Sequence, residues 1–261
     1  ADSFDYKNKH AIVQYLEDLS KIDYFYQIIL THNFDFFRTL SNNFVHRDRC
    51  LMSNRNSSTI TLTKAEGIKN YFIGKWKNNI ANNDYILCAT IPFTRNLIEY
   101  TKSENDPDYL KLTSLLHWKN DTDQITVGNY FDIYNRLFGT SYNTSNTQLV
   151  KDLLFTKATE ICARITYNGL NLEDKVLLSI AIRMQAEIFL VNELRLLKNE
   201  PNYWCQATSQ FGNLIKDYSS LASSSPSLRT LEKISITVSS NIHLNSFMYE
   251  PILDLTIEHL V

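Results

Sequence analysis

The chain has 261 residues, of which 44% are hydrophobic and 21% are charged, with only six glycines and a formal net charge of -2 at pH 7. This composition excludes a disordered or collagen-like chain and leaves one large or two modest globular domains. Because the net charge is close to zero, any polyanion-binding site has to be a local patch. The basic residues that offer such an edge are Arg47, Arg49, Arg55, Lys69, Lys75 and Lys77.

The first part of the chain has the pattern of an α/β unit. Residues 6–19 carry apolar side chains at helical spacing, and the run Ile28–Leu30 predicts a short buried strand that ends at polar Thr31. A Phe-rich segment, residues 34–44, predicts a second helix. Two short strands, 51–52 and 59–62, are then expected around a turn.

Helical spacing dominates the rest of the chain. Pro92 lies inside one of the expected helices, and Gly139 follows another like a C-terminal cap. The sequence therefore predicts a mainly α protein, with a short N-terminal α/β piece over residues 1–65 followed by a helical domain over residues 66–261. The helices are expected at 66–80, 84–102, 107–117, 127–138, 146–167, 172–198, 208–222 and 246–260.

The cysteine pattern and the length of the apolar runs indicate the cellular compartment in which the protein is expected. The four cysteines form no CxxC pair, which argues against a zinc site or a disulfide framework and is typical of a reducing cytoplasm. No apolar run approaches about 18 residues, so no membrane partner is expected. The start at Ala1 has neither a Met nor a signal-peptide pattern, and we expect a processed or excised chain.

The N-terminal unit, from Ala1-Asp2-Ser3-Phe4-Asp5 to Thr31-His32-Asn33, resembles the last part of an ABC-type ATPase domain. The branch that it resembles includes the recombination, repair and phage-defence ATPases. In that family a D-loop, a helix and a strand ending in a switch histidine follow one another. The resemblance implies that Ser3 to Asp5 form the D-loop and that His32 contacts the γ-phosphate of ATP or the attacking water.

The same resemblance implies ATP and Mg as cofactors of the full-length protein, and a homodimer formed through its ATPase heads. However, none of the six glycines lies in a GxxxxGK[ST] phosphate-binding loop. We therefore expect that these 261 residues bind no cofactor and do not hydrolyse ATP by themselves.

Two sets of residues in the helical part have the composition of a nuclease site. The first is Arg183 and Glu187, four residues apart on one helix face, together with the distant His243. An Arg that stabilises a pentavalent phosphate, a His that moves a proton and a carboxylate that orients them suffice for metal-independent RNA cleavage through the 2′-hydroxyl. The second set has the same spacing and comprises Arg95, Glu99 and His117.

Both sets resemble the Arg-x-x-x-Glu plus distant His pattern of the ATPase-linked anticodon nucleases, whose toxin domain belongs to the HEPN group of helical ribonucleases. In those proteins a helical nuclease domain directly follows the ATPase domain. The usual HEPN signature places an Arg a few residues before the His, whereas Ser239-Ser240-Asn241 precede His243 here.

The resemblance implies an antiviral defence protein whose helical domain is an ATP-gated endoribonuclease directed at RNA such as tRNA. The implied partners are a second copy, the RNA and another defence protein. Two alternatives stay open at this point. The helical domain is a non-catalytic oligomerisation or effector-binding module of the ATPase, or the chain is a free-standing helical protein with a chance Thr-His pair. In either case Arg-x-x-x-Glu is an ordinary helix salt bridge.

Overall fold

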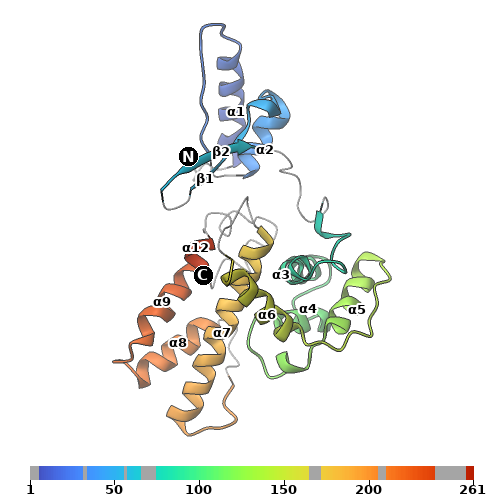
Figure 1. Ribbon diagram of the computed structural model, residues 1–261, viewed down its shortest axis with the longest axis vertical. Helices are drawn as coiled ribbons and strands as arrows, with labels where there is room; N and C mark the ends of the chain where they lie inside the picture. Colours follow the sequence, from blue (N-terminus) through green and yellow to red (C-terminus); the bar gives the residue numbers. More distant parts are fainter. Residues whose placement is uncertain are drawn as a thin grey trace. The chain divides into compact units, whose positions relative to one another are not determined.

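The computed structural model describes residues 6–31, 34–55, 58–65, 75–164, 172–204, 210–238 and 257–261. The chain divides into two compact units, Ala1–Gly74 and Lys75–Val261 (Figure 1). The described part is mainly helical with a single two-stranded antiparallel sheet, which confirms the predicted fold class.

The first unit contains two helices and a hairpin. Helices α1 (Tyr6–Ser20) and α2 (Phe34–Asn43) are followed by the 3-10 turn η1 (Arg47–Arg49). Strands β1 (Leu51–Arg55) and β2 (Ile60–Lys64) then pair in antiparallel register, with Leu51 opposite Lys64 and Arg55 opposite Ile60. The two short strands expected around a turn are thus present.

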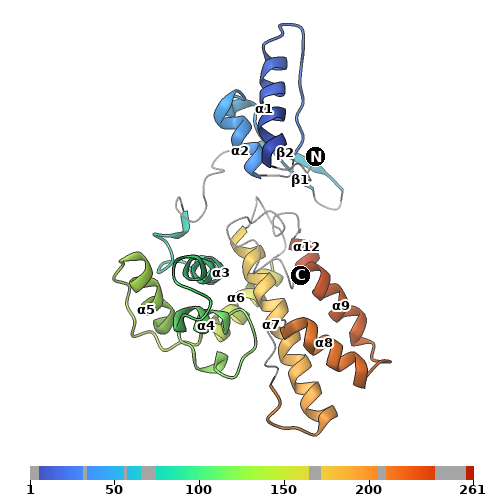
Figure 2. The ribbon, with the colours of Figure 1, turned by 180° about the vertical axis from the view of Figure 1, so that it is seen from behind.

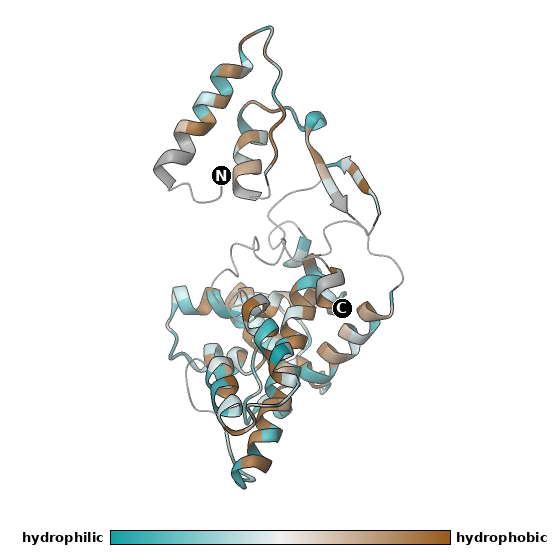
Figure 3. Cartoon of the chain, turned by 90° about the vertical axis from the view of Figure 1, so that its left-hand side faces the viewer, coloured by the Kyte–Doolittle hydropathy of each residue, from teal (hydrophilic) through white to brown (hydrophobic). Residues whose placement is uncertain are grey.

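The predicted buried strand at residues 28–30 is wrong. Residues 25–31 connect α1 to α2 without belonging to a strand, and Ile28 and Leu30 are 90% and 88% exposed. Figure 3 shows the apolar colouring of this connection. The β-branched composition that suggested a strand is present, but a strand also needs a hydrogen-bonding neighbour, which the described part of this unit does not supply.

The second unit is built around helix α7 (Leu172–Lys198). Its described neighbours α3, α6, α8, α9 and α12 all contact α7 (Figures 1 and 2). Because α7 is surrounded, apolar residues occur on nearly all of its sides, as expected of a central helix. The elements besides α7 are α3 (Asp84–Thr101), α4 (Pro107–Thr113), η3 (Thr122–Gln124), α5 (Val127–Phe138), α6 (Val150–Cys162), α8 (Gln210–Leu221), α9 (Ser227–Thr237) and α12 (Ile257–Leu260).

Local capping explains why some helices begin and end where the sequence predicts. Thr126 and Asn129 form a reciprocal capping box at the start of α5, and Gly139 ends that helix with a left-handed φ of 64°. Asn83 caps α3, accepting hydrogen bonds from the backbone N–H groups of Tyr85 and Ile86 at 3.0 and 3.2 Å. Pro92 lies within α3 and does not begin it.

Other predictions for the helical unit need correction or lie outside the description. The helix expected to reach His117 ends at Thr113, and the one expected over 146–167 spans only Val150–Cys162. Helix α9 was not predicted. The expected helices at 66–80 and 246–260 fall largely on residues that are not described; residues 77–82 form turns, and Ile257–Leu260 is helical.

Candidate functional site

A buried polar cluster combines members of the two predicted sites. Arg183 and Glu187 lie on one face of α7, as their spacing predicts, and are 4% and 0% exposed. His117, from the other predicted set, follows α4 and is 5% exposed. Its Nδ1 lies 2.8 Å from Glu187 Oε1, and Arg183 Nε lies 3.4 Å from the same oxygen.

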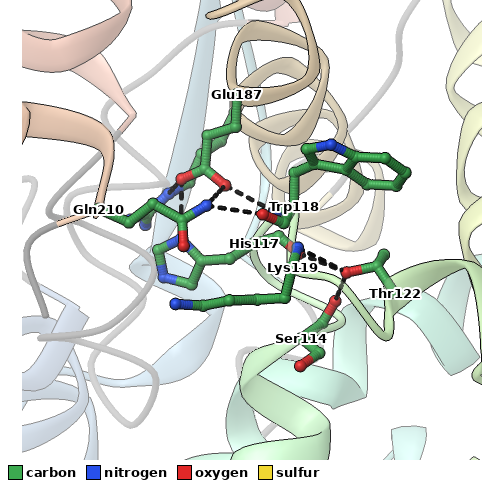
Figure 4. A network of polar contacts seen from close by, with 8 residues as sticks. Ser114, His117, Trp118, Lys119, Thr122, Glu187 and Gln210 are labelled. Atoms are coloured by element: carbon green, nitrogen blue, oxygen red, sulfur yellow. Dashed lines mark hydrogen bonds and ion pairs between the residues drawn. The ribbon is translucent and has the colours of Figure 1, made fainter. Parts of the chain in front are cut away.

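A tight turn after α4 presents His117 to Glu187. The fully buried Thr122 holds this turn, because its hydroxyl lies 2.8 Å from the carbonyl oxygen of Ser114 and 3.0 Å from that of His117. The same hydroxyl accepts a hydrogen bond from the Lys119 backbone N–H at 2.9 Å. The turn also aims the Trp118 backbone N–H at the carboxylate, 2.7 Å from Glu187 Oε2 (Figure 4).

The carboxylate of Glu187 is surrounded by hydrogen-bond donors from three parts of the chain. Besides His117, Arg183 and the Trp118 N–H, the side chain of Gln210 donates to Oε2 at 2.9 Å. Gln210 Nε2 also donates to the Trp118 carbonyl at 2.8 Å, so the first residue of α8 joins both sides of the cluster (Figure 4). Each carboxylate oxygen thus has two donors, which is the arrangement that a buried anion requires.

The electrostatics favour a charged Glu187 beside a neutral His117. Burial opposes the imidazolium form and lowers the pKa of His117, although the Glu187 carboxylate acts in the opposite direction. Burial alone would raise the pKa of Glu187, but His117, Arg183 and the Trp118 N–H together lower it. The pKa of Arg183 is lowered by burial, yet a guanidinium stays protonated at pH 7.

This charge state fixes the roles of the two imidazole nitrogens. A carboxylate only accepts hydrogen bonds, so Nδ1 of His117 carries the proton that it shares with Glu187, and Nε2 carries the lone pair. A base oriented by a buried carboxylate is the arrangement that general-base catalysis uses. Together with the Arg183 guanidinium, the cluster contains a proton acceptor, its orienting group and a cation.

The remaining members of the second predicted set form a separate cluster on α3. Arg95 donates to Thr113 Oγ1 and Asn96 Oδ1, both at 2.9 Å, and its guanidinium lies 4.2 Å from the centre of the Tyr109 ring. Glu99 is 3.7 Å from Arg95 and 40% exposed. His117 therefore pairs with Glu187 and not with Glu99, although Arg95 is close enough to Arg183 to affect its pKa.

The other predicted site residues lie outside the described residues. These are His243 of the first set and Ser3, Asp5 and His32 of the ATPase-like unit. Among the basic residues considered for a polyanion edge, Arg47 and Arg49 are exposed on η1, whereas Lys75 pairs with Glu173 and Lys77 lies over the Phe138 ring.

Sequence reasoning missed the parts of the cluster that are not charged. Gln210 and Thr122 gave no signal, because a Gln at a helix start and a Thr in a turn are common. Their roles become visible only when residues 117, 187 and 210 come together in space.

No group of three or more metal-ligating side chains occurs among the residues that were placed. No described helix is long and apolar enough to cross a bilayer. Comparison with protein-family models, with curated proteins and with solved structures gave no match.

Proposed function

We propose that the helical unit is a metal-independent endoribonuclease whose site consists of Arg183, Glu187 and His117. The observation that carries this proposal is the convergence on one Glu187 oxygen of an imidazole, at 2.8 Å, and a guanidinium, at 3.4 Å. These are the three residue types that the chemistry needs, and His117 takes the role that the sequence suggested for His243.

In the proposed reaction, Nε2 of His117 removes the proton of a ribose 2′-hydroxyl, and the 2′-oxygen attacks the adjacent phosphorus. The bond from phosphorus to the 5′-oxygen breaks, and that oxygen takes the proton back from the imidazolium. Glu187 holds the ring and stabilises its transient charge, while Arg183 offsets the extra negative charge on the pentavalent phosphorus. The products are a 2′,3′-cyclic phosphate and a 5′-hydroxyl.

Burial of the site fits a gated enzyme. With side chains of His117 and Glu187 only 6% and 0% exposed, a phosphodiester reaches the site only after the surrounding segments move. We assign that movement to ATP binding in a nucleotide-binding part of the protein, so the described arrangement is the closed state.

The ATPase part of this proposal rests on the sequence resemblance of the first unit. Tyr24, Tyr26, Ile28 and Leu30 alternate along the connection after α1 and are 86–93% exposed. Between them, Gln27 and Ile29 are partly buried, and Gln27 donates a hydrogen bond to the Leu16 carbonyl at 3.0 Å. This alternation has the period of two of an extended chain, but residues 25–31 form no strand in the described structure, so it does not add to the sequence resemblance.

RNA integrity after expression of the protein together with its nucleotide-binding part in a bacterial host tests the nuclease. We expect His117→Asn, which keeps a donor toward Glu187 but has no base, to abolish cleavage while the protein stays folded. His46→Asn is the matched control, because the His46 side chain is exposed and its hydrogen bond and ion pair in the described structure are with Asp48. Cleavage by folded His117→Asn at the wild-type rate would remove the assignment.

The second candidate function is the non-catalytic oligomerisation or effector-binding module. The burial of Glu187 favours it, because a fully buried ion pair also serves to fix how helices pack. Under this function, wild-type protein leaves RNA intact, and variants of the cluster change only the stability of the fold.

A further inference from the structure

The described part of the first unit has a small apolar core and a large apolar surface. Its buried apolar side chains are Val13, Leu40 and Cys50. The exposed large apolar side chains are more numerous, namely Tyr15, Ile22, Tyr24, Phe25, Tyr26, Ile28, Leu30, Leu51, Ile60 and Leu62. Side chains of these types are usually buried, and a contiguous exposed group of them marks an interaction surface.

A continuous stretch of these side chains, residues 24–30, lies on the connection between α1 and α2 (Figure 3). On its inner side, the hydrogen bond from Gln27 to the Leu16 carbonyl ties the stretch to α1. The backbone N–H and C=O groups of residues 26–30 form no hydrogen bond with another backbone group in the described parts of the chain. These groups are therefore available to a strand of a partner. The outer side of the stretch carries Tyr24, Tyr26, Ile28 and Leu30.

The composition of residues 24–30 favours pairing with an identical segment. The sequence Tyr-Phe-Tyr-Gln-Ile-Ile-Leu contains no charged residue and no proline, and most of its residue types have high β-propensity. Short uncharged segments of this kind pair with copies of themselves. A partner with charged side chains would have to desolvate them against this apolar surface, whereas a second copy of the segment brings no charge.

An antiparallel arrangement makes the segment complementary to itself. With a two-fold axis at Gln27, Tyr26 lies opposite Ile28 of the second copy, and Tyr24 lies opposite its Leu30. Aromatic and branched aliphatic side chains that lie directly opposite each other stabilise a strand pair. Because both copies use the same surface, the two-fold axis also limits the assembly to a dimer.

The available apolar area is sufficient for a weak dimer. The four outer side chains offer about 700 Å² on each copy, since side chains of this size bury about 150–250 Å² each. Pairing side by side covers about half of that area together with the backbone edges, or about 1,000 Å² in total. This total is close to the lower limit for a specific interface, so we expect a dissociation constant in the micromolar range.

We propose that residues 24–30 form an antiparallel strand pair with the same residues of a second copy of this chain. The second copy supplies the hydrogen-bonding neighbour that the segment lacks in the described structure. This pairing is independent of the nuclease function, because no residue of the second unit takes part in it.

Sedimentation velocity and light scattering of the 261-residue chain measure the oligomeric state. Over about 1–100 μM protein, the average mass should rise from 30.4 kDa toward twice that value. Ile28→Lys places a charge on the outer side of both strands and should weaken the dimer at least about ten-fold. Ile236→Lys is the matched control, because Ile236 is 81% exposed on α9, and it should leave the dimer unchanged.

A second variant tests the register of the two strands. Tyr26→Glu alone should also weaken the dimer. Combined with Ile28→Lys, it places opposite charges across both Tyr26–Ile28 pairs, so at low salt the combined variant should dimerise about three-fold or more tightly than either single variant. Circular dichroism checks that each variant is folded, as expected for substitutions at exposed positions; if Ile28→Lys is not folded, Tyr26→Glu decides.

A wild-type chain that stays at 30.4 kDa throughout the titration would overturn the pairing. Open-ended aggregates without a dimer would overturn it as well, since the two-fold arrangement requires a closed pair. A dimer that persists unchanged in the folded single variants would show that another surface joins the copies. A combined variant that dimerises no more tightly than the single variants would overturn the antiparallel register.

Discussion

Replacing Glu187 by Gln tests the buried cluster at its centre. Each oxygen of the carboxylate accepts from two donors: His117 and Arg183 at Oε1, and the Trp118 N–H and Gln210 at Oε2. A Gln side chain has the same shape but replaces one oxygen with an NH₂ group. With the NH₂ group at the Oε2 position, the Trp118 N–H and Gln210 both face a donor. With NH₂ at the Oε1 position, Arg183 faces a donor, whereas neutral His117 can accept through Nδ1 by changing its tautomer. In either orientation Arg183 loses the charge of the carboxylate.

The magnitude follows from these losses. An unsatisfied buried polar group costs about 1–3 kcal/mol, and breaking a buried ion pair costs about 3–5 kcal/mol. We therefore expect Glu187→Gln to lower the free energy of unfolding by about 3 kcal/mol, which corresponds to a fall in melting temperature of about 6–12 °C for a unit of this size. Urea denaturation and thermal melts followed by circular dichroism measure both quantities.

Glu160→Gln is the matched control for this change. Glu160 is bound by Lys157 at 3.0 Å and by the Tyr85 hydroxyl at 2.6 Å, but it is exposed, so the same substitution should have a much smaller effect. A melting temperature of Glu187→Gln equal to that of the control would show that the carboxylate does not hold the cluster together.

Three further predictions use other parts of the second unit. Burial lowers the pKa of His117 in the folded protein, so below about pH 6.5 the unfolded chain binds a proton that the folded chain does not bind, and the free energy of unfolding should fall from pH 7 toward pH 5. His117→Asn should reduce this pH dependence by at most about 1.4 kcal/mol per pH unit, as urea denaturation at several pH values would show. Gly128→Ala should lower the free energy of unfolding by about 2 kcal/mol or more, because the new Cβ would clash with the Thr144 carbonyl. Gly212→Ala should raise it by about 0.5–1 kcal/mol, because this position of α8 has open space around it and Ala favours a helix. Equal melting temperatures of the two variants would contradict the packing around Gly128. Iodoacetamide should label exposed Cys162 in the native protein but buried Cys88, whose thiol pKa is raised by burial, only after unfolding, as mass spectrometry of digested protein would show.

Features with local causes could be predicted from the sequence. Helices α5 and α7 have the predicted bounds, 127–138 and 172–198, because apolar spacing and, for α5, caps at both ends specify them within a few residues. Helix α9 was missed because its Ser- and Thr-containing sequence has weak helix propensity and depends on contacts with α7 and α8.

The same distinction applies to the candidate site. The pairing of Arg183 with Glu187 is a local consequence of helical spacing. The choice of histidine is not local, since residue 117 is 70 positions from Glu187 and reaches it only because the turn held by Thr122 packs on α7. The spacing of residues in the sequence therefore cannot predict that His117 contacts Glu187.

The last prediction compares two buried hydroxyl groups, those of Ser179 and Thr122, which we expect to have opposite effects on stability. Ser179 lies on the same α7 ridge as Lys175, Arg183 and Glu187, at intervals of four residues, and is 1% exposed. Its hydroxyl forms no hydrogen bond within the described structure, whereas the equally buried hydroxyl of Thr122 holds the His117 turn.

Ser179→Ala should therefore raise the free energy of unfolding by about 1 kcal/mol, by removing an unsatisfied hydroxyl and improving helix propensity. Thr122→Val, which removes a satisfied hydroxyl without changing shape, should lower it by about 2 kcal/mol. Urea denaturation of both variants measures whether the free energy of unfolding rises in the first and falls in the second. A loss of stability in Ser179→Ala would mean that the hydroxyl has a partner in the folded protein, whereas a gain means that the ridge carries a polar group that folding does not require.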